Sequence, residues 1–455
     1  MAEFCENGAK AVAEEATKRR VSPEFFAKNS IASLLEQDDY WLGQQGRLTH
    51  PMLLEDVDLP DEQRPYRPIE WSAAFELIKD ELRAMASPEE AVFYTSGRTS
   101  NEAAFLYQIL GRGLGSNNLP DCSNMCHESS GFALGQTIGI GKGSVSLEDI
   151  HQAKLILVAG QNPGTNHPRM LSALEKAKQN GARIVAINPL PEAGLLRFKN
   201  PQTVRGVIGD GTQIADEFLQ IRLGGDQALF QALGKCVLEA AQTQDGVVDH
   251  EFIAQYTTGF ADYSATVTAF DWQPVLEATG LSEAKIRALA ADLVASDRTI
   301  VCWAMGLTQH KHSVSTLRDV VNLLLLQGNT GKTGAGVCPV RGHSNVQGDR
   351  TMGIFEKMPE SFHDALDAEF SFESPRKHGF DTVAAIHAME QGKVRLFMGM
   401  GGNFVRAAPD TERTEAALRS TALTVQVSTK LNRSHVVTGQ RALILPTLGR
   451  TERDR

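Results

Sequence analysis

A cysteine and a histidine stand side by side at Cys126-His127, within the segment 122–131, which reads C-S-N-M-C-H-E-S-S-G. A thiolate is both a nucleophile and a soft metal ligand, and an imidazole can carry a proton near neutral pH. The two side chains can therefore bind a metal ion and move a proton within one turn of chain. A cysteine is also often only a small buried hydrophobe, so the surrounding sequence must decide between these interpretations.

A glycine-rich loop around Arg341 is the second candidate. Residues 334–348 read G-A-G-V-C-P-V-R-G-H-S-N-V-Q-G, and their four glycines and one proline predict an ordered loop rather than a helix. An arginine on a rigid loop is suited to bidentate capture of a carboxylate or a phosphate. A surface arginine in a flexible loop fits the segment equally well, so the segment alone leaves both interpretations open.

Three other patterns give weaker signals. The tetrapeptide T-G-K-T at 330–333 resembles the end of a phosphate-binding loop, but the first glycine of that motif would fall at Leu326, inside an expected helix. Cys122 and Cys126 have no second cysteine pair at zinc-finger spacing, which argues against a structural zinc site. Among the functions considered, a nicotinamide-dependent dehydrogenase has the least support. Its dinucleotide-binding motif G-x-G-x-x-G, followed at the right distance by an acidic residue, does not occur in the sequence.

The elements that must position these residues repeat a strand–loop–helix pattern. The first copy has a buried strand at 155–159, a Gly/Asn loop at 160–167, a helix at 168–180 and a strand at 183–187. The second copy has a strand at 394–398, a Gly-rich loop at 399–403, a helix at 411–420 and a strand at 423–427. Units of this length are typical of parallel crossovers, and such loops present backbone N–H groups to phosphates. We therefore predict an α/β fold with two related, doubly wound, Rossmann-like domains and mostly parallel sheets.

Further elements are expected around these two copies. They are short helices at 5–20 and 23–37, a strand at 91–95 followed by a helix at 101–111, an α-rich stretch at 226–296, a strand at 299–304 and a helix at 313–327. Ser72 is expected to cap an amphipathic helix that begins there. Cys236 and Cys302 are expected in the core, because each sits within an apolar helix or strand pattern.

Composition and charge argue against several classes of partner. The net charge is −10 and the longest basic run is 18–20, so the electrostatic footprint of a nucleic-acid-binding protein is missing. The longest aliphatic block, 320–326, is interrupted by Asn322 and too short to span a bilayer, so no membrane segment is expected. The acidic start of the chain lacks an apolar signal region, which favours the cytoplasm. Six cysteines spread over 455 residues indicate free thiols rather than a disulfide framework.

Six segments, in order along nearly the whole chain, resemble the molybdopterin oxidoreductase superfamily of formate dehydrogenase and dimethyl sulfoxide reductase. They are residues 4–10, 124–127, 306–310, 326–331, 341–348 and 428–435. Within the superfamily, the chain is most similar to formate-dehydrogenase-like alpha subunits of the YdeP-type branch. Each segment alone is weak, but their combination and order are highly specific.

This resemblance implies a molybdenum or tungsten ion clasped by two molybdopterin guanine dinucleotides, one on each α/β domain. It implies that Cys126 is the metal ligand, that His127 accepts a proton and that Arg341 holds the carboxylate of the substrate. The implied reaction is the two-electron oxidation of formate or a similar small molecule, with electrons passed to a redox partner. The residues implied to bind the cofactor are Gly97, Arg98, Gly160, Asn162, Asn166, Asn188, Asp226, Gly399, Gly401, Asn403, Ser428, Lys430, Asn432 and His435.

The chain departs from the family pattern at both ends. Family members carry a 4Fe-4S cluster near the N-terminus, which needs several cysteines close together, whereas this chain has only Cys5 there. The lysine that usually stands two residues after the last cluster cysteine is Asn7 here. Cys5 is the candidate iron–sulfur ligand, and the cluster itself is expected in the full-length protein rather than in this portion. We expect an internal portion of a longer enzyme, lacking the N-terminal cluster segment and the C-terminal domain and inactive by itself.

The expected domains are discontinuous in sequence. Residues 1–64 would be the remnant of a cluster-associated domain, residues 65–121 with 342–455 the first dinucleotide-binding domain, and residues 122–341 the second. The alternative function is a cofactor-free scaffold, or a subunit of an electron-transfer complex, that retains the fold. Family members with that role generally lose the metal-ligand position, so the intact Cys126 argues against it.

Overall fold

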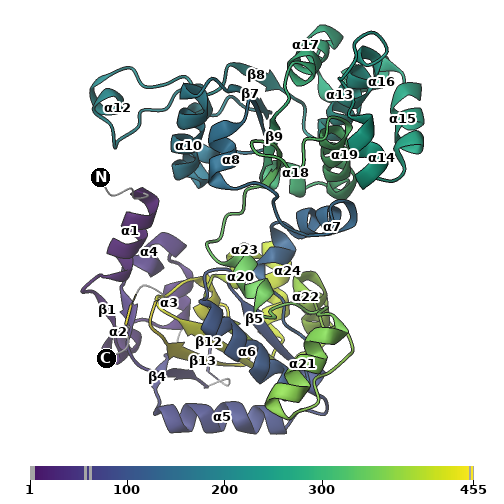
Figure 1. The fold of residues 1–455 in the computed structure, drawn as a ribbon. Helices are drawn as coiled ribbons and strands as arrows, with labels where there is room; N and C mark the ends of the chain where they lie inside the picture. The colour runs from purple at the N-terminus through teal and green to yellow at the C-terminus, as the bar shows by residue number, and fades with distance from the viewer. Residues whose placement is uncertain (1–5, 56–58, 61–63, 450–451, 454–455) are drawn as a thin grey trace. The chain divides into compact units, whose positions relative to one another are not determined.

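The computed structural model describes residues 6–55, 59–60, 64–449 and 452–453. Residues 126–342 form one compact unit, and residues 8–125 together with 343–455 form the other (Figure 1). Each unit is built around its own sheet. The chain therefore crosses from one unit to the other beside Cys126 and again beside Gly342.

The first unit contains a five-stranded parallel sheet with the strand order β10-β9-β6-β7-β8. Its strands are β6 (Leu155–Ala159), β7 (Arg183–Asn188), β8 (Glu217–Gln220), β9 (Thr299–Trp303) and β10 (Gly336–Pro339). The chain begins in the middle at β6, runs outward through β7 and β8, and returns to β9 on the other side of β6. The order reverses between β6 and β9, and ligands of doubly wound sheets bind at the carboxyl ends of the strands at such a point.

Helices cover both faces of this sheet, because alternate residues of a buried strand point to opposite sides. Leu155 and Leu157 of β6 belong to one apolar core, whereas Ile156 belongs to the other. The first core is closed by α7 (Glu128–Thr137), α13 (Asp226–Ala240), α17 (Glu283–Val294) and α19 (Ser313–Leu326), and the second by α8 (Leu147–Gln152) and α10 (Pro168–Gln179). Other helices are α9 (Pro163–Asn166), α11 (Ala193–Leu196), α12 (Val204–Ile208), α14 (His250–Tyr256), α15 (Phe260–Ala269), α16 (Trp272–Thr279) and α18 (Met305–Thr308). Cys236 and Cys302 are buried in these cores, as predicted.

The second unit contains a six-stranded mixed sheet with the order β4-β3-β13-β12-β11-β5. β5 (Ala91–Thr95), β11 (Leu396–Met400), β12 (Leu423–Ser428) and β13 (Arg441–Pro446) are parallel, whereas β3 (Met52–Leu54) and β4 (Arg67–Pro68) are antiparallel. β1 (Arg20–Val21) and β2 (Arg47–Leu48) form a separate parallel pair. On the outer side of β5, the amide of Phe93 donates to the carbonyl oxygen of Asn118 at 2.9 Å. The segment that follows α6 (Asn101–Gly113) thus lies on one side of β5, and β11 lies on the other, so the strand order reverses at β5 as it does at β6.

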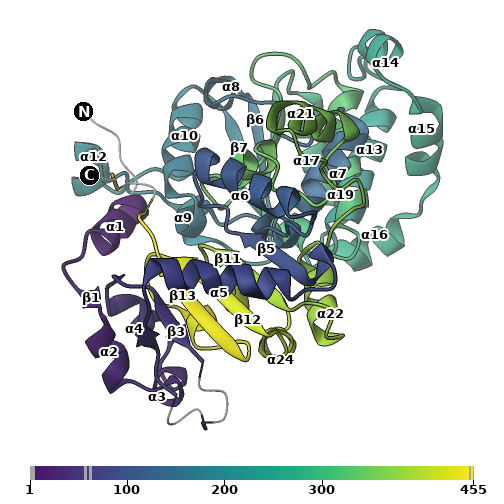
Figure 2. The same ribbon diagram turned by 90° about the horizontal axis from the view of Figure 1, so that it is seen from below.

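Helices again cover both faces of this sheet. α5 (Trp71–Arg83) and α6 (Asn101–Gly113) pack on one face, along which Figure 2 shows α5 lying, and α22 (Thr382–Glu390) and α24 (Thr411–Arg419) pack on the other. α2 (Pro23–Lys28), α3 (Ile31–Leu35) and α4 (Asp39–Gln44) enclose a further apolar cluster with β3 and β13. Other elements are α1 (Glu6–Glu15), α20 (Val346–Thr351), α21 (Glu360–Phe370) and α23 (Phe404–Ala407), with the 3-10 helices η2 (Pro88–Glu90), η3 (Cys122–Met125) and η4 (Arg433–His435).

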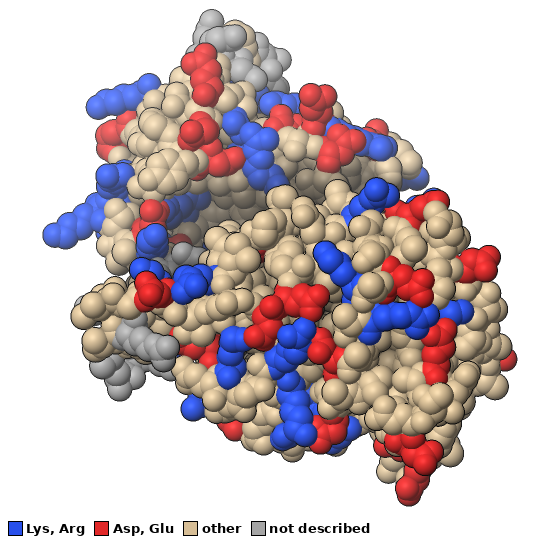
Figure 3. Space-filling model, turned by 90° about the horizontal axis from the view of Figure 1, so that it is seen from above, with Lys and Arg blue, Asp and Glu red and all other residues tan. Residues whose placement is uncertain are grey.

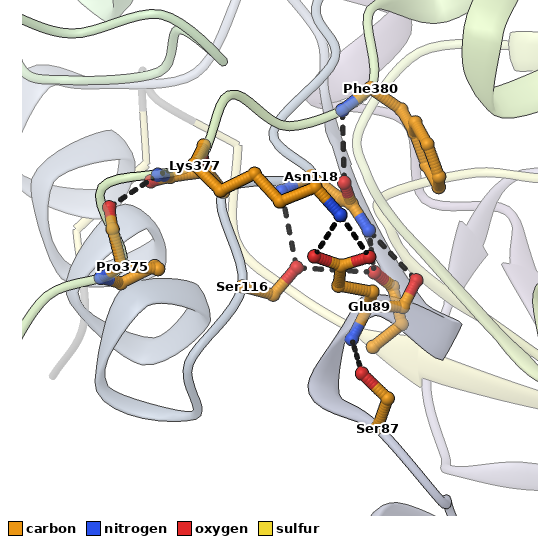
Figure 4. Close-up of polar contacts among 9 residues, drawn as sticks. Ser87, Glu89, Ser116, Asn118, Pro375, Lys377 and Phe380 are labelled. Carbon is orange, nitrogen blue, oxygen red and sulfur yellow. Dashed lines mark hydrogen bonds and ion pairs between the residues drawn. The ribbon is translucent and has the colours of Figure 1, made fainter.

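Asn118 ties three segments of the second unit together beside β5 (Figure 4). Its Nδ2 donates to the carbonyl oxygens of Glu89 and Ala91 at 2.9 and 3.1 Å, and its Oδ1 accepts from the amide of Phe380 at 2.9 Å. Lys377 Nζ lies 2.7 Å from the carboxylate of Glu89. Asn118 is buried, so these bonds replace those that water would make, and they fix the segment along the outer side of β5.

The sheets confirm the predicted fold class of two doubly wound, mostly parallel units, but several local predictions were wrong. α5 begins at Trp71, with Glu70 at the cap position, so Ser72 lies in the first turn and does not cap it. The helices predicted at 5–20 and 23–37 are shorter or broken, since Ser30 starts a new helix by accepting from the amide of Ser33.

Loop predictions also needed correction. The loop predicted at 160–167 contains the short helix α9, which Asn162 caps. The loop predicted at 334–348 contains β10, because pairing with β9 orders residues 336–339, and it also contains the start of α20. β11 begins two residues later than predicted and includes Gly399, because its register pairs Leu396 with Ala91 of β5.

Two surface properties bear on the expected partners. Within the described ranges, no helix is both long and apolar enough to cross a membrane. Lys and Arg side chains alternate with Asp and Glu over the face drawn in Figure 3. Many such charges are paired; Arg183, for example, lies 2.7 Å from the carboxylates of both Glu217 and Asp292.

Candidate active site

His127 is a buried histidine whose two ring nitrogens are both engaged. Nε2 lies 3.0 Å from the carbonyl oxygen of Val340, and a carbonyl can only accept, so Nε2 carries the hydrogen. Nδ1 therefore accepts from the hydroxyl of Ser130 at 3.0 Å, and the Ser130 oxygen accepts from the indole N–H of Trp303 at 3.0 Å. Burial, and then the positive charge of Arg341, lower the pKa of His127 to about 4. The ring is neutral at pH 7, and its basic atom faces Ser130.

Cys126 precedes α7 and is half-buried. Its carbonyl oxygen accepts from Thr308 Oγ1 at 2.7 Å and from Gln309 Nε2 at 3.4 Å. Both donors belong to the short segment that follows β9. The backbone of Cys126 is therefore held at the carboxyl edge of the sheet, beside the strand where the order reverses.

Arg341 follows β10 and is held through two groups. Its guanidinium donates to the carbonyl oxygen of Gly141 at 2.9 Å. Its own carbonyl oxygen accepts from Nε2 of His167 at 3.0 Å. Since the neighbouring Val340 accepts from His127, the structure brings Cys126, His127 and Arg341 together at one edge of the first unit.

The loop after β6 comes very close to the loop after β9. Gly160 has a left-handed backbone (φ +58°), and a Cβ there would lie 2.8 Å from the backbone of Gly306. Asn188, at the end of β7, makes two hydrogen bonds to the backbone of Gln161, the residue after Gly160. Its Oδ1 accepts from the amide of Gln161, and its Nδ2 donates to the carbonyl of Gln161, each at 3.0 Å. The buried Oε1 of Gln161 accepts no hydrogen bond within the described residues. The Oε1 atom of Gln161 is thus an acceptor that a ligand could use at the point where the strand order reverses.

Three other predicted residues of the first unit lie along the same edge. Asn162 caps α9 and donates to the carboxylate of Glu192 at 2.6 Å, and Asn166 ends that helix. Asp226 begins α13 and is buried. Burial raises the pKa of Asp226 to about 6, although the charge of His310 opposes this shift. The structure therefore places all five predicted residues of this unit at or after the carboxyl ends of β6, β7 and β8.

In the second unit, the turn after β5 is fastened to Cys122. The amide of Gly97 donates to Cys122 Sγ at 3.2 Å, and the same sulfur lies 3.2 Å from Nδ1 of His343. A Cβ at Gly97 would lie 2.7 Å from that sulfur, so no larger residue fits. Arg98, the next residue, is exposed.

The loop after β11 is fastened to η4. Asn432 Nδ2 donates to the carbonyl oxygen of Gly402 at 2.8 Å, next to Gly401. Asn403 donates to Asp39 at 2.9 Å and accepts from the hydroxyl of Ser434 at 3.2 Å. Two buried polar atoms of this sheet, Thr95 Oγ1 and Gln426 Nε2, make no hydrogen bond within the described part of the chain. Ser428, the last residue of β12, is buried and stands two residues after Gln426.

Three predicted residues of the second unit have roles within the protein itself. Lys430 Nζ pairs with the carboxylate of Glu14 at 2.9 Å, and this bond lowers the pKa of Glu14. His435 is fully buried, and its Nδ1 accepts from the amide of Asn432 at 3.0 Å. Gly399 lies inside β11 rather than in the loop after it. Cys5 lies outside the described residues.

The molybdopterin oxidoreductase family model matches residues 47–454. The chain belongs to this family. It is 65% identical over 455 residues to an uncharacterized oxidoreductase of Mycobacterium tuberculosis, and 45% identical over 458 residues to the protein YdeP of Escherichia coli. It is 31% identical over 300 residues, or 65% of its length, to formate dehydrogenase H of Escherichia coli, and this match covers 38% of that enzyme. These matches confirm the family resemblance predicted from the sequence.

One solved structure resembles nearly the whole chain. Acetylene hydratase from Pelobacter acetylenicus has a TM-score of 0.68 to it at 16% identity, covering 96% of this chain and 57% of that one. At that identity, the likeness shows the shared fold alone. The chain spans 58% of the mycobacterial relative and 60% of YdeP.

The sequence patterns missed two residues that hold the candidate site together. Ser130 stands three residues after His127, a helical spacing that places both on one side of α7 and was available as a signal. His167 lies 174 positions before Arg341, whose carbonyl it contacts. No spacing pattern connects those two residues, because only the fold brings them together.

Proposed function

We propose that the chain is the dinucleotide-binding portion of a molybdenum- or tungsten-dependent oxidoreductase that removes two electrons from formate or a similarly small anion. The observation that carries this proposal is the grouping of Cys126, His127 and Arg341 at one sheet edge. A metal-binding thiol, a base and a cation are the groups that such a reaction needs. The similarity to formate dehydrogenase H supports formate as the first substrate to test.

The residues of each unit fit one tail of a molybdenum bis(molybdopterin guanine dinucleotide). The fit rests on the Gly160–Gly306 approach, which leaves room for no side chain, and on the buried polar atoms of Gln161, Thr95 and Gln426 that have no hydrogen-bond partner among the described residues. When bound, the metal supplies the electron-accepting chemistry, with Cys126 as its protein ligand. In the domain proposed at 122–341, the residues that would hold the cofactor are Gly160, Asn162, Asn166, Asn188 and Asp226. In the domain proposed at 65–121 with 342–455, they are Gly97, Arg98, Gly399, Gly401, Asn403, Ser428, Lys430, Asn432 and His435.

Arg341 would hold the carboxylate of the substrate. The bond to Gly141 orients its guanidinium, and the bond from His167 fixes its backbone. A planar guanidinium offers paired donors that match the two oxygens of a carboxylate, which a lysine ammonium cannot do. Arg341 would therefore select small carboxylates and fix their orientation.

His127 would receive the proton at Nδ1, because Nε2 already donates to Val340. The hydroxyl of Ser130 points its hydrogen at Nδ1, so Ser130 is the group through which a proton reaches the ring. Its oxygen would take up the incoming proton while its own hydrogen moves to Nδ1. Trp303, which donates to the same oxygen, holds Ser130 in place during this transfer.

The remaining components would belong to the full-length protein. A 4Fe-4S cluster, for which Cys5 is the candidate ligand in this sequence, would pass electrons to a redox partner. The cytoplasm is the proposed location of that protein.

The test uses the full-length protein, purified from a host that makes the cofactor. We expect near-stoichiometric molybdenum or tungsten, fluorescence of released oxidised pterin, and formate-dependent reduction of an artificial electron acceptor. Cys126→Ala should abolish turnover. Arg341→Lys, which keeps the charge but not the paired donors, should raise KM for formate at least about tenfold, since one bidentate contact is worth 1.4 kcal/mol or more.

Two outcomes would change the proposal in different ways. If the protein contains metal and pterin but does not turn over formate, formate is not its substrate, while the proposed class of enzyme stands. Absence of both after native purification would favour the cofactor-free scaffold or electron-transfer subunit.

A further inference from the structure

Two cysteines face each other across neighbouring strands of the first unit. Cys302 in β9 and Cys338 in β10 are direct partners in the parallel ladder. Both side chains lie on the face of the sheet covered by α8 and α10, because both belong to that apolar core. Adjacent strands lie about 4.8 Å apart. This spacing falls inside the Cα separation of about 4.4–6.8 Å that a disulfide bond spans.

The two thiols differ in access and in acidity. β10 is the last strand of the sheet, with Ser144 bonded along its outer side, and Cys338 is half-buried, whereas Cys302 is fully buried. Interaction between the two side chains lowers the pKa of Cys338, and together with burial it raises the pKa of Cys302. A half-buried thiol in direct register with a buried partner thiol is the arrangement of a redox-sensitive cysteine and its resolving cysteine, and the lowered pKa of Cys338 makes it the one to react first.

We infer that Cys338 and Cys302 form a thiol-oxidation site that responds to a hydroperoxide. The Cys338 thiolate attacks one peroxide oxygen: a sulfur–oxygen bond forms, the oxygen–oxygen bond breaks, and the peroxide is reduced to an alcohol or to water. Cys302 then attacks the sulfenic acid of Cys338, so that a disulfide forms and water leaves with the thiol proton of Cys302. In sum, two thiols and one hydroperoxide give one disulfide, one alcohol and one water.

The cysteine pair is connected to the candidate active site through Val340, two residues after Cys338. Beyond Cys338, the amide of Val340 donates to the carbonyl of Trp303 at 2.8 Å, which extends the β9–β10 ladder. The carbonyl of the same Val340 accepts from His127, and Arg341 follows. A disulfide between β9 and β10 would therefore constrain the backbone at Val340, which positions His127 and Arg341. The oxidation chemistry is independent of the proposed function; only its effect on turnover rests on it.

The test follows the thiols of the reduced full-length protein by mass spectrometry. After treatment with one equivalent of hydrogen peroxide and alkylation, the peptides with Cys302 and Cys338 should lose alkylation in equal proportion and appear as one linked peptide. Cys236, buried in the other core, should stay alkylated. In Cys302→Ser, a dimedone adduct should accumulate on Cys338; in Cys338→Ser, Cys302 should stay reduced.

Several results would overturn the inference. They are unchanged alkylation of both cysteines in the wild-type protein, oxidation of Cys302 in Cys338→Ser, or a linked peptide that joins Cys338 to Cys122 or Cys126 instead. The wild-type measurement needs no variant, so it decides the question even if a serine variant fails to fold. Loss of formate turnover alone counts neither for nor against it, because that readout belongs to the proposed function.

Discussion

His127 donates the hydrogen on Nε2 to the carbonyl oxygen of Val340 across 3.0 Å, joining segments that are 213 positions apart in the sequence. This one bond connects the start of α7 to the end of β10. It also fixes the tautomer of the ring, so that Nδ1 accepts from Ser130 and the Ser130 oxygen accepts from Trp303. The three groups act as one buried network, in which Ser130 is the shared member.

Ser130→Ala should lower the free energy of unfolding by about 1–3 kcal/mol, because it leaves the buried indole N–H of Trp303 and Nδ1 of His127 without a partner. Chemical denaturation of both proteins measures this difference. Ser129→Ala is the matched control, since within the described part of the chain the Ser129 hydroxyl makes one long contact, 3.4 Å from the carbonyl of Thr308. Its change should stay within about 0.5 kcal/mol. Equal effects of the two variants would contradict the network.

Gly160→Ala tests the close approach of the loops after β6 and β9. The added Cβ would meet the backbone of Gly306 at 2.8 Å and the side chain of Leu307 at 2.7 Å, and the backbone is left-handed. We expect a loss of about 1–2 kcal/mol from the left-handed conformation, with a further 1–3 kcal/mol from overpacking. Thermal or chemical unfolding measures the total.

Gly181→Ala is the control that separates these two costs. Gly181 also has a positive φ, of +93°, but a Cβ there would meet no atom within 4 Å. Only the conformational cost should therefore remain. A Gly160→Ala protein no less stable than the Gly181→Ala protein would show that the two loops can move apart.

Asn188→Asp changes one atom in the side chain that holds the peptide of Gln161. The Oδ1 acceptor is kept, but the Nδ2 donor becomes an oxygen that faces the Gln161 carbonyl at 3.0 Å. Since Asn188 is buried, we expect a loss of about 2–3 kcal/mol at pH 7. Asn180→Asp, on an exposed helix end where Nδ2 donates to the carbonyl of His151, should cost under about 1 kcal/mol. A similar loss at both positions would show that the bonds of Asn188 to the Gln161 peptide do not stabilise the fold.

The sequence predicted β5, β6, β7, β9, β11 and β12, whose residues carry strong local signals, but it did not predict β3, β4, β8, β10 or β13. Residues 155–159 and 91–95 are continuous apolar runs that end in Gly-containing turns, and the strands were found there. β10 gave no such signal, since it contains a glycine at 336 and a proline at 339. That strand forms because β9 supplies its hydrogen bonds, a long-range effect that local propensity cannot report.

Prediction of the candidate site divided in the same way. Cys126 and His127 are adjacent in sequence, so their types alone drew attention to them. The tautomer of His127 depends on Val340, and the backbone of Arg341 depends on His167. Those partners are set by the order of the strands in the sheet, which sequence spacing does not reveal. Lys430 was assigned to the cofactor by resemblance alone, and its ion pair with Glu14, 416 positions away, is a further contact that no sequence spacing indicated.

His435 should make the stability of the protein depend on pH between about 6.5 and 4. Burial lowers its pKa from 6.5 to about 4, although the carbonyl oxygen of Asn432, 3.2 Å from Nδ1, opposes this shift; the neutral ring accepts at Nδ1 from the amide of Asn432. Between these pH values the unfolded chain binds a proton that the folded chain does not. The free energy of unfolding is therefore highest above pH 6.5 and falls as the pH drops through 4. The loss attributable to this group is about 3 kcal/mol.

His435→Gln isolates this contribution, because the amide oxygen of glutamine can accept from Asn432 but does not titrate. Chemical denaturation at pH 7, 6, 5 and 4.5 should show a steeper decline in the wild-type protein than in the variant. The variant should lie closer to the wild-type protein at the lowest pH than at pH 7, since protonation removes the advantage of histidine. Parallel declines in the two proteins would mean that other groups cause the acid sensitivity, and that His435 is not held neutral by its burial.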